Sequence, residues 1–121
     1  MMRTMTQTIQ SIIIGIAVKD VHEAASWYKK LLGDVETIEP APGTLELQLS
    51  DNVWLQLDDT GYLKIGGSII RLETQDIDAI HAKVKALKPD AGDIEVVEGV
   101  VSYFDFEDPA GNRLSYYQLL Q

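Results

Sequence analysis

The side chains of this chain that could do chemistry are aromatic rings and carboxylates rather than thiols. The 121 residues include no cysteine and two histidines, which excludes a disulfide, a thiolate nucleophile, an iron–sulfur cluster and a thiolate zinc site. Trp54, Tyr103 and Tyr117 lie in strand-like segments that also carry acidic side chains. Rings that stack on a flat group and carboxylates that neutralise its charge suit a cationic, partly aromatic small molecule. These residue types favour ligand recognition, provided that the fold brings them to one face.

Size and charge narrow the classes of partner. A chain of this length forms one domain whose core needs no metal or disulfide for stability. Ten basic and nineteen acidic residues give a net charge of −9, which repels nucleic-acid phosphates and anionic membrane surfaces. The longest apolar run, 12–18, is too short to span a membrane. We therefore expect a soluble, cytoplasmic protein that binds neither nucleic acid nor membrane.

Two segments have the period of amphipathic helices, and each is bounded by capping signals. The first begins after Asp20, where Glu23 completes a capping box, and ends at Gly33. The second begins after Asp76 and ends before Pro89. Eight other segments are rich in β-branched residues, alternate in polarity or are bounded by turn residues, which predicts strands. They are residues 10–18, 34–39, 44–50, 53–58, 67–74, 94–98, 100–107 and 113–119.

The same order of elements occurs twice along the chain. A shift of 56 residues superposes Ile13 on Ile69 and Asp20 on Asp76, and each strand–helix unit is followed by three strands. Such a repeat indicates a duplicated half-domain whose two halves are connected at 61–67. The alternative is that the two amphipathic units agree by chance. We interpret 1–121 as a single domain, with one module at about 8–60 and the other at about 66–121.

The most specific stretch is FDFEDPAGNRL at 104–114. Proline fixes one turn dihedral, and glycine and asparagine accept positive φ, so the stretch predicts a hairpin with strands on both sides. Taken with AASWYKKLLG at 24–33 and the repeated order of elements, it resembles the vicinal oxygen chelate superfamily. That superfamily includes glyoxalase I, bleomycin-resistance proteins, fosfomycin-resistance enzymes and extradiol dioxygenases. The resemblance covers nearly the whole chain.

The resemblance implies an α+β fold in which two βαβββ modules curl a mixed sheet into a cup, with helices outside and a ligand inside. In the metalloenzymes of the superfamily four cup positions bind a divalent ion, and they fall here on Ile13, Gln56, Ile69 and Ser115. Isoleucine has no donor atom, and a serine with one glutamine is a poor substitute for imidazole and carboxylate ligands. The chain therefore lacks the metal-ligating side chains of the metalloenzyme pattern.

The two histidines do not supply the missing ligands. His22 falls in the first turn of one predicted helix and His81 on the flank of the other, both outside the cup. We accordingly expect no metal, no other cofactor and no catalytic residue.

The four implied positions also fix which side chains face the cup, because side chains alternate across a strand. The opposite parity, which includes Leu47, Leu55 and Phe104, is almost wholly apolar and belongs under the helices. Gly15 and Ala17 have the inward parity and would leave room at the cup floor. The ligand-binding residues predicted in this way are Glu46, Gln48, Trp54, Gln56, Arg71, Glu73, Tyr103, Asp105, Ser115 and Tyr117.

The set of side chains that faces the cup has two interpretations. It could be the solvated side of a half-buried sheet, but three large rings would then expose apolar surface of the kind that marks a ligand groove or an interface. Within the face, Arg71 could pair with Glu73 instead of meeting a ligand.

The residues favour a metal-independent binding protein that sequesters or carries a cationic, partly aromatic molecule in an acidic, aromatic-lined cup. As an acidic, metal-free member of about 120 residues, the chain resembles the bleomycin-resistance proteins, and this resemblance implies a role in antibiotic resistance and a homodimer with shared grooves. One alternative is a lyase or dioxygenase of the vicinal oxygen chelate type, in which Gln56 and a carboxylate hold a metal atypically or the carboxylate acts alone as a base. Another is an accessory subunit that kept the fold and lost catalysis.

Overall fold

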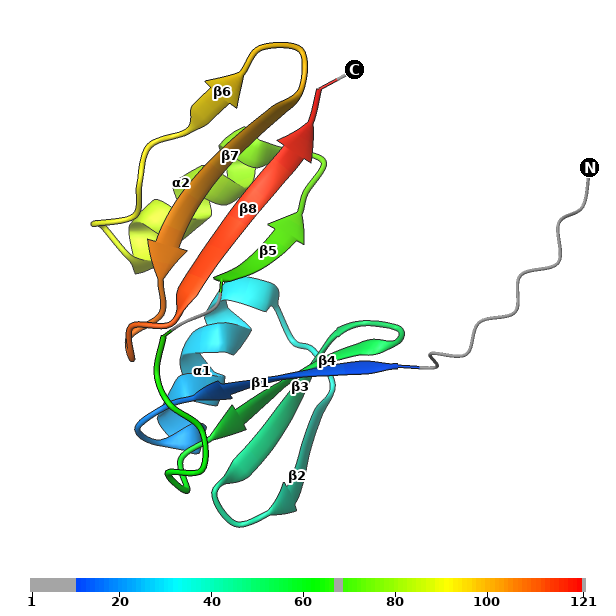
Figure 1. Cartoon of the computed structure of the whole chain (residues 1–121), viewed down its shortest axis with the longest axis vertical. Coiled ribbons are helices and arrows are strands. Elements are labelled where there is room, and N and C mark those ends of the chain that lie inside the picture. The colour runs from blue at the N-terminus through cyan, green and yellow to red at the C-terminus, as the bar shows by residue number, and fades with distance from the viewer. Residues whose placement is uncertain (1–10, 67–68, 121) are drawn as a thin grey trace, which may run out of the picture.

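Two modules of the same topology make up the computed structural model, which describes residues 11–66 and 69–120 (Figure 1). The elements of the first module are β1 (Ile12–Ala17), α1 (Val21–Leu32), β2 (Thr37–Ala41), β3 (Thr44–Ser50) and β4 (Val53–Asp58). Those of the second are β5 (Ile69–Glu73), α2 (Ile77–Leu87), β6 (Glu95–Val97), β7 (Val101–Glu107) and β8 (Arg113–Leu119). The predicted α+β fold with two βαβββ units is confirmed. Residue 10 of the first predicted strand and residues 67 and 68 of the fifth lie outside the described residues.

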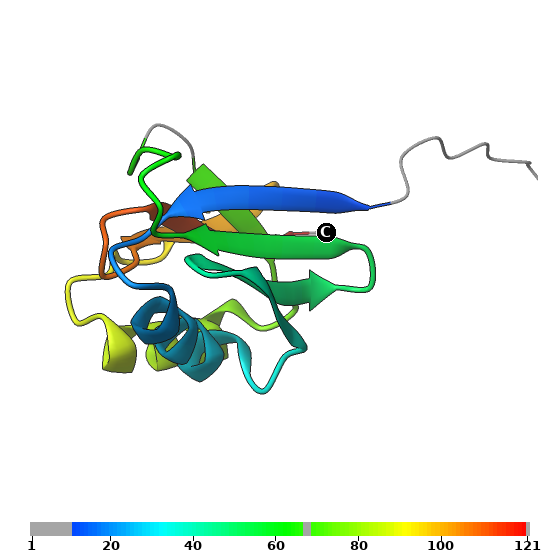
Figure 2. The same ribbon diagram turned by 90° about the horizontal axis from the view of Figure 1, so that it is seen from below.

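Each module forms a four-stranded mixed sheet. The strand orders are β1-β4-β3-β2 and β5-β8-β7-β6. The parallel pairs are β1 with β4 and β5 with β8, and the other pairs are antiparallel. In the part of the chain that the structure describes, no β-ladder joins the two sheets, so they do not close into a barrel. Figure 2 shows both helices on one side of the sheets. We call the other side of each sheet its open face.

Both helices are bounded by the residues that the sequence indicates. The Asp20 side chain accepts hydrogen bonds from the backbone N–H groups of His22 and Glu23, and the Asp76 side chain caps α2 by accepting from the Ala79 N–H. Gly33 ends α1 with a φ of 93°, a conformation that favours glycine. Neither helix is long and apolar enough to cross a membrane, as far as residues 11–66 and 69–120 show.

The second strand lies later in the chain than predicted, at Thr37–Ala41 rather than 34–39. After Gly33 the chain first turns, with the Val35 N–H bonded to the Gly33 carbonyl, and pairing with β3 then sets the strand. Pro40 lacks an N–H and is tolerated because β2 is an edge strand with an irregular register there.

One hydrophobic core lies between the sheets and the helices and is shared by both modules. Leu47 and Leu55 from the first sheet and Phe104 and Leu114 from the second are at most 1% exposed. They have the parity that we assigned to the side under the helices, and residues of the other parity therefore occupy the open faces. The predicted register is confirmed.

Candidate functional site

The DPAGN turn is a structural joint between the modules. The Tyr28 hydroxyl of α1 donates to the Asp108 Oδ2 atom over 2.8 Å, and both residues are buried. The Asn112 side-chain nitrogen donates to the same oxygen over 2.9 Å and to the Ala17 carbonyl at the end of β1 over 2.6 Å. The other Asp108 oxygen accepts from the backbone N–H groups of Ala110 and Asn112. We call Tyr28, Asp108, Asn112 and the Ala17 carbonyl the joint.

The joint holds its phenol in the neutral form. Burial raises the pKa of Tyr28, and the negative charge of Asp108 and the hydrogen bond to it raise this pKa further. Tyr28 is therefore a permanent donor, and the carboxylate receives four hydrogen bonds, as a buried charge requires. Sequence reasoning treated Asp108 and Asn112 only as turn residues.

The ten predicted ligand-binding residues lie on the open faces, but in two groups on separate sheets. Four belong to the first sheet, and six to the second. In the first group the Gln56 side-chain nitrogen donates to a Glu46 oxygen over 2.9 Å, and Trp54 lies in register with Ile13 and Gln48. Glu46 and Gln56 therefore partner each other.

The predicted room at Gly15 is filled by the chain itself. A β-carbon on Gly15 would lie 3.0 Å from a methyl carbon of Leu63, a residue of the loop after β4. That loop consequently crosses the open face of the first sheet beside Gln56. The expectation of an empty cup floor at this position is wrong.

In the second group, one row of side chains crosses three strands. Arg71 on β5, Ser115 on β8 and Asp105 on β7 are in register. An Arg71 guanidinium nitrogen donates to the Ser115 hydroxyl over 3.3 Å and lies 3.8 Å from an Asp105 oxygen. Of the described acidic residues, it is Asp105 and not Glu73 with which Arg71 makes its ion pair.

The next row of the second sheet is aromatic. Tyr117 lies in register with Glu73 on one side and with Tyr103 on the other, and both rings are half-buried. The Glu73 side chain is exposed, and its carboxylate makes no hydrogen bond or ion pair with another described residue.

A crevice of about 680 Å³ separates the two sheets. Its volume is within the range of small-molecule sites. Three predicted residues, Arg71, Glu73 and Tyr117, lie at it. The other walls come from apolar residues of the core parity, from the end of α1 and from the exposed Ser50 at the end of β3. These further wall residues are Ile14, Leu32, Leu49, Ser50, Val53, Ile70, Leu72 and Tyr116. We call this space the inter-sheet crevice.

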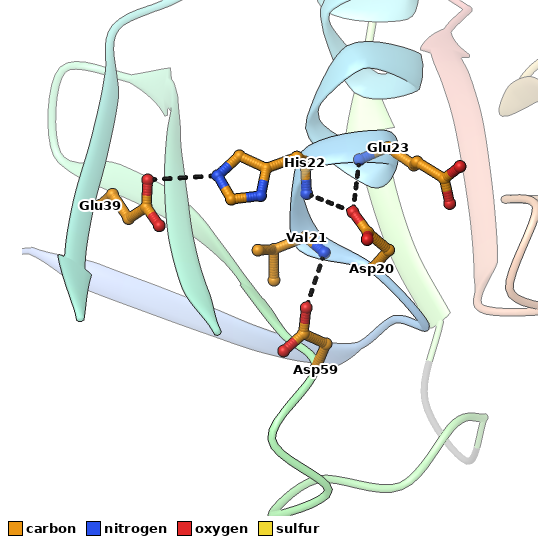
Figure 3. Close-up of polar contacts among 6 residues, drawn as sticks. All are labelled: Asp20, Val21, His22, Glu23, Glu39 and Asp59. Atoms are coloured by element: carbon orange, nitrogen blue, oxygen red, sulfur yellow. Dashed lines mark hydrogen bonds and ion pairs between the residues drawn. The ribbon is translucent and has the colours of Figure 1, made fainter. Parts of the chain in front are cut away.

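The amino end of α1 is not a further site for an anion, because its donors are already occupied. Figure 3 shows Asp20 receiving two backbone N–H groups, while the Val21 N–H donates to Asp59 over 3.0 Å. In the same view the His22 ring lies 3.3 Å from a Glu39 oxygen.

The residues present do not fit a metal centre. His81, the other histidine, lies 2.9 Å from the Gly92 carbonyl. At the four positions that the resemblance assigns to a metal, the two isoleucines have no ligand atom, Gln56 is bonded to Glu46, and Ser115 is bonded to Arg71. Within residues 11–66 and 69–120, no three His, Asp or Glu side chains cluster as a metal would require.

Comparison with known proteins supports the fold. No protein-family model matches the sequence, and no curated protein is similar enough to match it. Among solved structures, a glyoxalase/bleomycin resistance protein from Catenulispora acidiphila superposes with a TM-score of 0.72 and 24% identity, covering 90% of this chain and 97% of that one. A lactoylglutathione lyase from Agrobacterium tumefaciens superposes with a TM-score of 0.73 and 16% identity, covering 88% and 91%.

An antibiotic-binding protein from a Streptomyces species is also similar, with a TM-score of 0.69 and 20% identity, covering 97% of this chain and 99% of that one. At these identities the likeness establishes the fold. The fold predicted from the turn motif and the repeat, that of the vicinal oxygen chelate proteins, is confirmed.

Proposed function

We propose that this chain, which has the glyoxalase/bleomycin-resistance fold, is a metal-independent protein that binds a small cationic, partly aromatic molecule. The observation that carries the proposal is the inter-sheet crevice, whose apolar walls meet two tyrosine rings and one free carboxylate, that of Glu73. A planar apolar body would be buried between the sheets, and its positive charge would lie beside Glu73.

The charges at the crevice favour a cation over an anion. Arg71 is the basic residue among those that line it, and its guanidinium is engaged by Asp105 and Ser115. Glu73 has no such partner, so its charge is available to a ligand. Tyr117 offers a half-buried ring, whereas the Tyr116 ring stacks with Phe104 and Phe106 in the core. The face of an aromatic ring attracts a cation.

The side chains at the four implied metal positions support sequestration rather than metal-dependent catalysis. The side chains at the four metal positions lack donors or are bonded to neighbours. One protein with this fold is known to bind an antibiotic, and a drug of the chemistry above is the ligand class that we propose here.

We further propose that the protein acts as a homodimer in the cytoplasm. Ile13 on the open face of the first sheet is 53% exposed, and Leu119 on that of the second is 50% exposed. Large apolar side chains exposed on an ordered sheet favour an interface, and a second copy would cover them. The expected mass in solution is twice the 13.5 kDa of one chain, measured by light scattering after size exclusion, and a monomer at all concentrations would contradict this part.

Titration calorimetry with two bicyclic probes of similar size and opposite charge tests the binding proposal. We expect the protein to bind N-methylquinolinium more tightly than naphthalene-1-sulfonate, and to do so equally well with and without EDTA. Glu73→Gln should weaken quinolinium binding about two- to fivefold, the range for an exposed ion pair. Glu107→Gln is the matched control, because Glu107 is an acidic residue on the open face that does not line the crevice.

Each arm can contradict the proposal. Absence of quinolinium binding would refute the function, and binding that EDTA abolishes would refute metal independence. Equal effects of the two glutamate variants would show that the ligand lies outside the inter-sheet crevice.

A further inference from the structure

We infer that Asp105 is a positioning residue that sets the charge preference of the inter-sheet crevice by holding the Arg71 guanidinium away from Glu73. The inference rests on the proposed function. Asp105 does not line the crevice, so its effect on a ligand there would be exerted through Arg71.

Arg71 and Glu73 are natural partners in this sheet. They lie two residues apart on β5, which places both side chains on the open face, and both line the crevice. If the two paired, the crevice would lose its free negative charge. The structure instead directs the guanidinium away from the free edge of β5, across β8 and towards β7.

Two contacts hold Arg71 in that direction. Its Nη1 atom is 3.8 Å from the Asp105 Oδ1 atom and 3.3 Å from the Ser115 Oγ atom. Of these two partners of Arg71, Asp105 is the charged one, and it reaches Arg71 from two strands away. Asp105 also lines a separate hollow with Glu107 and Arg113, and none of these three residues lines the crevice.

Ser115 makes the reach possible because its side chain is small. It lies between Arg71 and Asp105 in the row and is fully buried. The Arg71 side chain therefore passes over Ser115 and donates to its hydroxyl oxygen, which is a second anchor. A large side chain at this position would separate the ion pair.

Removing the Asp105 charge should release the guanidinium towards Glu73. Both Arg71 and Asp105 are about half exposed, with 52% and 55% of their side chains accessible, so the pair is held weakly enough for the arginine to change partner. Once Glu73 is neutralised, the crevice keeps its apolar and aromatic walls but loses its preference for positive charge.

The test measures the affinities of N-methylquinolinium and naphthalene-1-sulfonate by titration calorimetry in four proteins, namely the wild type, D105N, R71Q and the double variant. In D105N we expect quinolinium affinity to fall about two- to fivefold and sulfonate affinity to rise by a similar factor. In the R71Q background, where no guanidinium can move, D105N should change quinolinium affinity by less than about twofold. E107Q removes the same charge from the same strand and should leave both affinities near wild type.

The outcomes separate this inference from the proposed function. If the wild type binds quinolinium and D105N behaves like E107Q, the positioning role is refuted while the proposed function stands. If D105N has the same effect with and without Arg71, the residue acts by its own charge and the inference is likewise overturned. If the wild type does not bind quinolinium at all, the proposed function fails and this inference fails with it. Thermal unfolding confirms that each variant is folded.

Discussion

Replacing Tyr28 by phenylalanine is the sharpest test of the joint between the two modules. The change removes one hydroxyl and keeps the ring, which is 1% exposed and packed edge-on against Trp27 at a centroid distance of 5.0 Å. The lost contact is the 2.8 Å hydrogen bond to the Asp108 Oδ2 atom. Three donors to that carboxylate remain, two from backbone N–H groups and one from Asn112.

The expected cost follows from those contacts. A buried hydrogen bond to a charged acceptor contributes about 1.5–3 kcal/mol. Because Asp108 keeps three partners and no cavity larger than an oxygen atom forms, we expect a loss of about 1.5–2.5 kcal/mol in the free energy of unfolding. For a domain of this size that corresponds to a fall of roughly 5–12 °C in Tm.

The pH dependence gives a second readout. The pKa of Tyr28 in the folded protein is raised above its ordinary value by burial, by the charge of Asp108 and by their hydrogen bond. The neutral phenol therefore stabilises the fold fully below about pH 10, and this contribution falls as the pH rises above that value. Above pH 10 the wild type should lose stability more steeply than Tyr28→Phe, and the difference between them should shrink.

Urea unfolding followed by circular dichroism between pH 7 and pH 11 measures both effects. Tyr62→Phe is the matched control, because Tyr62 is 86% exposed and should change stability by less than about 0.5 kcal/mol. If Tyr28→Phe lies as close to wild type as this control at pH 7, or if its stability falls with pH as steeply as that of the wild type, the reasoning about the joint is refuted.

Two further changes test other parts of the structure. Asp59→Ala removes the acceptor of the Val21 N–H and should cost about 0.5–2 kcal/mol in urea unfolding; Asp59→Asn keeps an acceptor, and an equal loss in both variants would contradict the capping role. Burial raises the pKa of Tyr116 to about 12, so its contribution is present below about pH 10 and is lost as the pH rises through 12. Tyr116→Phe should therefore show a shallower decline of stability between pH 10 and 12, and an unchanged slope would argue against this assignment.

Much of the fold could be predicted from local signals in the sequence. Asp20 and Gly33 bound the first helix because capping depends on neighbouring residues. The register follows from the four positions that the resemblance implies. The alternation of Leu45, Leu47 and Leu55 with polar residues supports it, because a shift of one residue would move every apolar side chain out of the core. The second strand was misplaced because its bounds depend on pairing with β3 rather than on its own residues.

The site was less predictable because its contacts are distant in sequence. Asp108 was interpreted as a turn residue, since its partner Tyr28 is 80 residues away. Ile14 and Leu72 have the core parity, yet they line the inter-sheet crevice because the two sheets separate there. Strand parity indicates the face of a sheet on which a residue lies, and it contains no information on the space between two sheets. The pairing of Arg71 stayed open between Glu73 and a ligand because its partner depends on the order of the strands in the sheet: Asp105 lies two strands away and holds it.

The separation of the two sheets has a mechanical consequence. The joint ties the modules at Ala17, where β1 ends, and at Asn112, just before β8 begins. The crevice lies away from the joint on both strands, at Ile14, which precedes Ala17, and at Tyr117, which follows Asn112. In the described chain no β-ladder joins the two sheets beside the crevice. A small rotation of one module against the other about the joint would therefore widen the crevice. Such a rotation would disturb side-chain packing between the helices and break no sheet hydrogen bond. In the function that we propose, such a crevice would accept molecules of several widths and select them by the sign of their charge.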